Sequence, residues 1–184
     1  MSTIRREVGF WPTLFNFRLG ELLLQPEFFS SVIVGVGGGV GLLLITERTA
    51  RVTTASDFLA IIGALLGVVF AAFALVISLF SDSYLKWLNK APQGVRGFLA
   101  PFMFTIGLQV GTILLVVGYR ATALEVPPKV EKPAWVFLCF AFTYSMLNIV
   151  ALARAVLGHG ITRARAAEIG EPDSPVRPFQ QRGR

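Results

Sequence analysis

The chain has 184 residues, of which 54% are hydrophobic and 15% charged, and its formal net charge is +6. This composition leaves too little polar surface to cover a globule in water, so it excludes an ordinary soluble domain. The single cysteine, Cys139, excludes an internal disulfide, a cysteine-based metal site and a c-type haem motif.

Four apolar stretches, at 28–46, 58–80, 98–118 and 134–157, carry no charge except Arg154. About 20 helical residues rising roughly 1.5 Å each match a hydrocarbon layer about 30 Å thick. The sequence therefore predicts an all-α integral membrane protein, a four-helix bundle whose transmembrane domain covers 28–157.

Residues 1–27 form a polar N-terminal lead. Within it, the spacing over 12–25 predicts an amphipathic helix lying along the membrane surface, with Arg18 among the lipid headgroups. This interfacial helix either anchors the inner ends of the spans or acts as a lever or lipid sensor. Because the first apolar stretch begins only at Phe28, a cleavable signal is not expected.

The first span is rich in glycine. Gly35 with Gly39, and Gly37 with Gly41, form two pairs at a spacing of four residues. Without Cβ atoms, such faces let another helix approach until the backbones touch, which predicts helix packing. A hinge or an unwound ligand loop is the alternative, because glycine weakens a helix.

The second span repeats this pattern. Gly63, Gly67 and Ala71 form a small-residue face that can dock on span one. Ser56 and Asp57 are typical N-cap residues and predict where the helix begins.

The third span combines a proline with two further small residues. Pro101 is expected in its first turn, where a missing amide costs least, and Gly107 with Gly111 provide packing positions near mid-depth.

Polar residues occur inside the third and fourth spans. Gln109 lies near the bilayer centre, and span four contains Thr143, Tyr144, Ser145 and Asn148. Because an unsatisfied amide in hydrocarbon is costly, we expect Gln109 to bond Ser145 or Asn148 across the two antiparallel spans. The alternative is that these polar groups line a conduit in an oligomer.

The distribution of basic residues predicts orientation. Twelve lie on the side of the termini and five on the side of the connections 47–57 and 119–133, so both termini are expected in the cytoplasm. Residues 126–133 read as a stiff extended link. Tyr119 is expected at the outer face, and the residues expected at headgroups are Arg18, Lys86, Trp87, Lys90, Trp135 and Arg154.

The basic tail, 158–184, is expected to be cytoplasmic and disordered after a short helix over 161–169. No apolar stretch contains Asp, Glu, His or Lys, and the serines and threonines have no companion base. The sequence therefore predicts no enzyme activity, no cofactor and no metal. Its basic residues are spread along the chain, which favours lipid over nucleic acid as their counter-charge.

Residues 63–82, from Gly63-Ala64-Leu65-Leu66-Gly67 to Ser78-Leu79-Phe80-Ser81-Asp82, precede an aromatic and basic turn. This stretch resembles small four-span bacterial membrane proteins of uncharacterised type, some of which are components of anti-phage defence systems. The resemblance implies a sensor or effector of the bacterial inner membrane.

We therefore expect a non-enzymatic membrane protein that self-associates, or binds another membrane subunit, through glycine-lined helix faces, as a sensor, scaffold or effector. The alternative is an oligomeric channel or transporter for water, small neutral solutes or ions, in which Gln109, Ser145 and Asn148 line a path between protomers.

Overall fold

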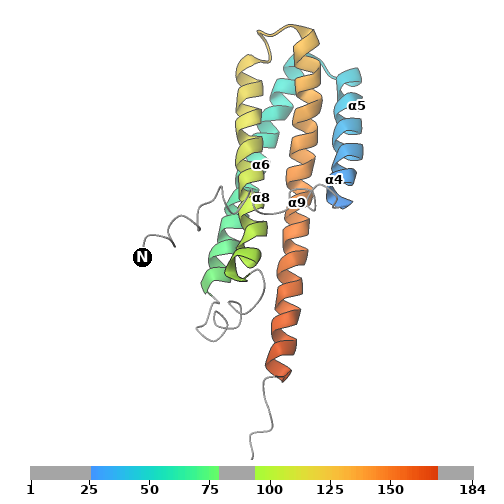
Figure 1. Ribbon diagram of the computed structural model, residues 1–184. Helices are drawn as coiled ribbons and strands as arrows, with labels where there is room; N and C mark the ends of the chain where they lie inside the picture. The colour runs from blue at the N-terminus through green and yellow to red at the C-terminus, as the bar shows by residue number, and fades with distance from the viewer. Residues whose placement is uncertain (1–25, 79–93, 170–184) are drawn as a thin grey trace, which may run out of the picture. The chain divides into compact units, whose positions relative to one another are not determined.

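The computed structural model describes residues 26–78 and 94–169, in which all regular secondary structure is helical (Figure 1). The elements are α4 (Pro26–Ser31), the π-helix η1 (Val32–Val36), α5 (Gly37–Ile45), α6 (Arg48–Ser78), α8 (Gly94–Thr122) and α9 (Pro128–Ile169). The interfacial helix expected over 12–25, the turn after span two and the tail beyond 169 lie outside the described residues.

Within the described residues, four segments are long and apolar enough to cross a membrane: Pro26–Ile45, Arg48–Ser78, Leu99–Thr122 and Pro128–Gly158. The prediction of an all-α fold with four spans is confirmed. The chain divides into one unit up to Leu152 and another from Ala153, and the described part of the second unit is the continuation of α9 to Ile169.

Several helix ends differ from the prediction. α6 begins at Arg48, so Ser56 is not a cap, and its hydroxyl donates to the carbonyl of Val52 within the helix at 3.2 Å. α9 begins at Pro128, so residues 128–133 of the expected extended link are helical. Charged residues can continue a helix beyond the apolar core because helical backbone groups remain hydrogen-bonded to each other.

Two further boundaries also need correction. α8 begins at Gly94, which places Pro101 inside the helix and not in its first turn. α9 continues without interruption to Ile169, where a separate short helix was expected over 161–169.

From Phe102 onward, the buried residues of α8 recur at intervals of three and four. They are Phe102, Thr105, Gln109, Thr112, Val116 and Tyr119, and the series continues to Ala123 just after the helix ends. On α6 the buried positions Ala55, Ile62, Val69 and Val76 are each seven residues apart. This spacing is that of helices packed side by side with a coiled-coil seam, and it decides which residues face the core.

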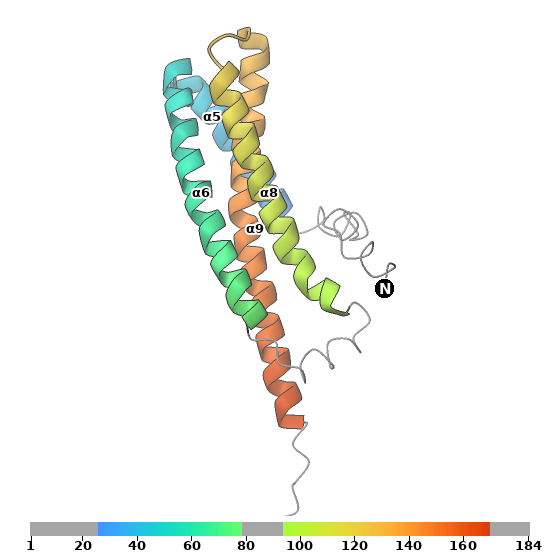
Figure 2. The same cartoon turned by 90° about the vertical axis from the view of Figure 1, so that its left-hand side faces the viewer.

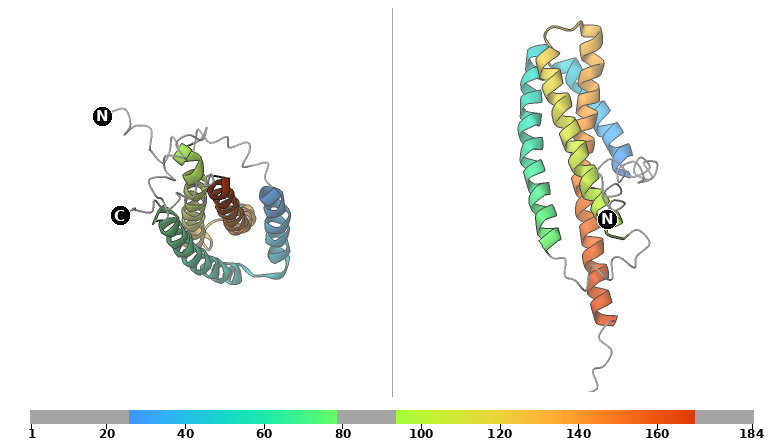
Figure 3. Two further views of the ribbon diagram at one scale, coloured as in Figure 1. Left: turned by 90° about the horizontal axis from the view of Figure 1, so that it is seen from below. Right: turned by 60° about the vertical axis from the view of Figure 1, so that its left-hand side comes forward.

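The helices α5, α6 and α8 form an arc around the part of α9 that precedes Ala153 (Figure 3). α6 and α8 lie side by side (Figure 2). The core joins Ile62 of α6 and Val116 of α8 to Trp135, Leu138 and Cys139 of α9. α9 is therefore the helix that the other spans share.

Trp135 was predicted to lie among lipid headgroups, and this prediction is wrong. Its side chain is 0% exposed, stacks on Phe58 with ring centroids 6.0 Å apart, and contacts the ring of Tyr119 at 5.5 Å. Tyr119 is buried as well and is not an exposed anchor of the outer face. Both residues occupy seam positions, where packing against the other helices takes precedence over the preference of aromatic rings for the interface.

Candidate functional site

The first candidate site is the contact between the glycines of the first span and α9. A Cβ atom added to Gly35 would lie 2.7 Å from the Cα atom of Phe140, and one added to Gly39 would lie 3.0 Å from the Cβ atom of Cys139. Distances this short leave no room for a side chain at Gly35. The face of this span that contains Gly35 and Gly39 therefore lies directly against the backbone of α9.

The other glycine positions are open. A Cβ atom at Gly37, Gly41, Gly63, Gly67 or Gly111 would meet nothing within 4 Å among the described residues. The expectation that the glycine face of span two docks on span one is therefore wrong. Gly107 is half-buried.

Small residues instead follow one exposed line along α6. We call this line the α6 outer face. Its members are all exposed and are spaced by four, three, four and three residues: Ala60, Ala64, Gly67, Ala71 and Ala74. It points away from the buried positions of the same helix, because a helix turns about 100° per residue.

The second candidate site is a buried cluster of charged and polar groups at the end of the bundle where α5 joins α6 and α8 joins α9. The Nε and Nη2 atoms of Arg51 donate to the two carboxylate oxygens of Glu131, each at 2.9 Å. The Tyr119 hydroxyl donates to the same carboxylate at 2.6 Å. Arg51 is 6% and Glu131 1% exposed, so the pair is bidentate and withdrawn from solvent.

This cluster ties the spans together. Arg51 also donates from Nη1 to the backbone carbonyl of Thr46, which follows α5. The neighbouring Arg48 donates to the carbonyl of Val126 in the connection between α8 and α9. Groups from the ends of all four spans therefore meet here, around one carboxylate.

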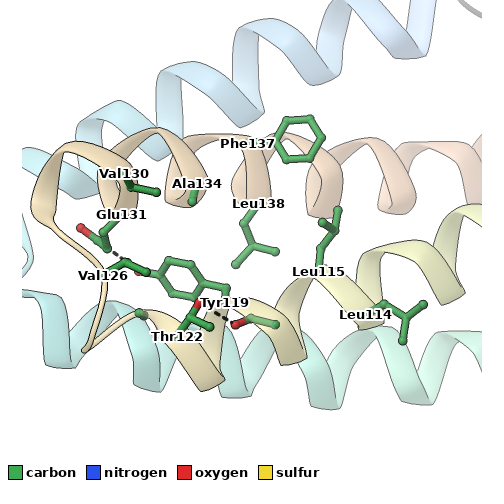
Figure 4. Close-up of a pocket in the computed structure, with 12 residues that line it drawn as sticks. Leu114, Leu115, Tyr119, Thr122, Val126, Val130, Glu131, Ala134, Phe137 and Leu138 are labelled. Carbon is green, nitrogen blue, oxygen red and sulfur yellow. Dashed lines mark hydrogen bonds between the residues drawn. The ribbon is translucent and has the colours of Figure 1, made fainter.

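The third candidate site is a cleft between α8 and α9 beside this cluster (Figure 4). Its volume is about 250 Å³, and its walls are mainly apolar, with Leu115, Phe137 and Leu138 among them. Tyr119 and Glu131 form its polar end. A second apolar groove, of about 510 Å³, lies between η1 and α9 and shares Phe137 as a wall.

The polar residues expected near mid-depth lie inside the chain. Gln109 is 1% exposed, and Ser145 and Asn148 are also buried. Asn148 does bond across to α8, but its Oδ1 accepts from the hydroxyl of Thr105 at 2.7 Å and not from Gln109. The expectation that these residues line a path between protomers is therefore wrong, because their side chains face the interior of one bundle.

The remaining predicted residues have simpler surroundings. The Thr143 hydroxyl donates to the carbonyl of Cys139 at 2.9 Å, within α9. The buried ring of Tyr144 stacks on Phe140 with centroids 5.9 Å apart. Arg154 is exposed. Arg18, Lys86, Trp87 and Lys90 lie outside the described residues.

Sequence reasoning missed the Arg51–Glu131–Tyr119 cluster, because it placed all three residues at the exposed outer side of the membrane domain. The spacing of these residues from the buried positions could nevertheless have revealed the cluster. Arg51 lies four residues before the buried Ala55, and Glu131 lies four before the buried Trp135. Extending the seam outward from the apolar core places both charges on the buried faces of their helices.

The fold and these sites define a multi-pass, all-α membrane protein whose spans are joined by a buried charge cluster at one end. Within 26–78 and 94–169, no group of three or more His, Cys, Asp or Glu residues is placed to hold a metal ion. Comparison with protein-family models, curated proteins and solved structures finds no match.

Proposed function

We propose that this chain is a non-enzymatic membrane protein that pairs with a second copy of itself through the α6 outer face and acts as a sensor, scaffold or effector. The excess of basic residues on the side of the termini supports placing both termini in the cytoplasm. The bacterial inner membrane is the location that the resemblance of residues 63–82 implies.

The observation that carries the pairing is the run of five small, exposed residues along α6. Beside this line the same helix exposes large residues: Ile61 is 44%, Val68 60% and Leu75 63% exposed. Large aliphatic side chains suit contact with lipid tails, whereas a strip of Ala and Gly about four turns long leaves the backbone of α6 accessible. Such a strip favours a closely packed helix.

The chain itself shows how close two helices can come at such a face. At Gly35 the backbone of α9 lies where a side chain would otherwise be. In lipid there is no hydrophobic drive between helices, so close van der Waals packing provides much of the attraction. The α6 outer face offers the same kind of surface and has no such neighbour within the described chain.

Energy transfer between donor- and acceptor-labelled copies in lipid vesicles tests this proposal. Gly67→Leu places a large side chain in the middle of the α6 outer face and should weaken association about tenfold, equivalent to about 1.4 kcal/mol. The matched control is Val68→Leu, which enlarges the adjacent exposed residue outside the face. It should leave association unchanged.

Two results would count against the proposal. Equal association of the two variants would show that the face is not the contact. A wild-type chain that gives no energy transfer with itself, but co-purifies with another membrane subunit through this face, would assign the face to that subunit.

A further inference from the structure

Five polar residues are buried inside the bundle, and we call them the polar belt: Thr105, Gln109 and Thr112 of α8 with Ser145 and Asn148 of α9. The three residues of α8 are successive seam positions, and each is 1% exposed. The hydrogen bond between Thr105 and Asn148 fixes the relative level of the two helices. Because these helices are antiparallel, Gln109 lies one turn further along, near the level of Ser145.

Within this belt the amide of Gln109 stands apart. Neither its Nε2 nor its Oε1 atom has a hydrogen-bond partner among the described residues. A side-chain amide offers two donors and one acceptor oxygen, and burying it unpaired in an apolar surrounding is costly. Gln109 therefore needs hydrogen-bond partners from outside the described residues.

The neighbouring groups offer acceptors that are not exhausted. The Thr112 hydroxyl donates to the carbonyl of Leu108 at 2.8 Å, and a hydroxyl that donates to its own helix keeps lone pairs for an incoming donor. The hydroxyl of Tyr144, the residue that precedes Ser145 on α9, also lacks a partner among the described residues. Donors and acceptors thus occur together at one depth of the bundle.

We propose that the polar belt binds a small, uncharged hydrogen-bonding ligand inside the single chain, and that this ligand is water bound to the Gln109 amide. The belt contains no charged residue that could compensate an ion withdrawn from solvent, which disfavours a charged ligand. Buried water characteristically makes about three hydrogen bonds to protein groups that would otherwise be unsatisfied. This inference is independent of association through α6.

Water-edited solid-state NMR of the full chain in bilayers tests the site. Magnetisation from water should reach the Gln109 side-chain amide several-fold faster than the backbone amide of Val116, a fully buried seam residue two turns away. In Gln109→Leu, transfer from water to the methyl groups of Thr105 and Thr112 should fall several-fold.

Three results would overturn the proposal. The first is transfer to Gln109 no faster than to Val116. The second is a direct hydrogen bond from the Gln109 amide to Ser145 or Asn148 without a water signal. The third is an undiminished water signal at Thr105 and Thr112 in Gln109→Leu, which would show that Gln109 does not hold the water.

Discussion

The first two spans contain similar small residues and use them in opposite directions. On the first span Gly35 and Gly39 face inward against α9, while Leu44 is 82% exposed. On α6 the buried positions include the large residues Ile62 and Val69, whereas the five small residues of the α6 outer face are exposed. Small residues therefore do not by themselves show which neighbour a helix face will meet. The register relative to the buried seam decides it.

The comparison depends on both spans being held to α9 at the end where Arg51 and Glu131 meet, so breaking that cluster should have the largest effect. Glu131→Leu leaves the buried Arg51 charge unpaired and should lower the free energy of unfolding by about 3–5 kcal/mol. Equilibrium unfolding in mixed micelles measures this loss.

A double variant and a surface variant make the charge experiment specific. Replacing both partners, as Arg51→Met with Glu131→Leu, should return most of the stability, because no unpaired charge remains. Glu125→Gln changes an exposed carboxylate near the same end and should have almost no effect. Equal stability of Glu131→Leu and Glu125→Gln would show that the pair does not hold this end together.

The inward glycine face should give the next largest effect. Gly35→Ala places a Cβ atom 2.7 Å from the Cα atom of Phe140, and backbone cannot move aside as a side-chain tip can. Overpacking of this kind should cost about 1–3 kcal/mol of unfolding free energy. Gly39→Ala should cost less, since its nearest neighbour is the Cβ atom of Cys139 at 3.0 Å. Stability of Gly35→Ala equal to wild type would contradict the close contact.

Substitution of the exposed glycine Gly37 should have the smallest effect on stability, and it should stabilise the chain where Gly35→Ala destabilises it. An added Cβ atom there meets nothing within 4 Å, so Gly37→Ala changes only the helix propensity. It should stabilise the chain by about 0.5–1 kcal/mol. The same unfolding titration gives the value, and a clear loss of stability would mean that Gly37 has a neighbour that the single chain does not contain.

The fold class was predictable because the apolar stretches dominate the sequence. Hydropathy shows which part of a helix lies in the hydrocarbon layer, but it does not show how far the helix continues into the headgroup region. Residues 48–57 and 128–133 contain charges and Pro133, which usually indicate connections, yet both segments are helical. Their hydrogen-bonded backbone and the contacts of Arg51 with Glu131 extend the helices beyond the apolar core.

The candidate sites were predictable only in part, for a related reason. Polarity identified Gln109 and Asn148 as buried groups. Residue spacing, however, does not show which turn of α8 lies opposite Asn148, and the hydrogen bond is made by Thr105, one turn before Gln109. Glycine spacing identified the small-residue faces without their directions. A charge inside the seam, such as Glu131, requires knowing the seam first, because its sequence neighbours resemble an exposed connection.

The most direct test of pairing through α6 is a cross-linking scan in native membranes. Cys139→Ala removes the single cysteine, and cysteines are then introduced one at a time along α6. Two copies related by an axis along the membrane normal place each residue of a shared face opposite itself. The account predicts strong cross-linking at Ala60, Ala64, Gly67, Ala71 and Ala74 and weak cross-linking at Ile61, Val68 and Leu75. Uniform yields along the helix, or maxima at the three large residues, would contradict it.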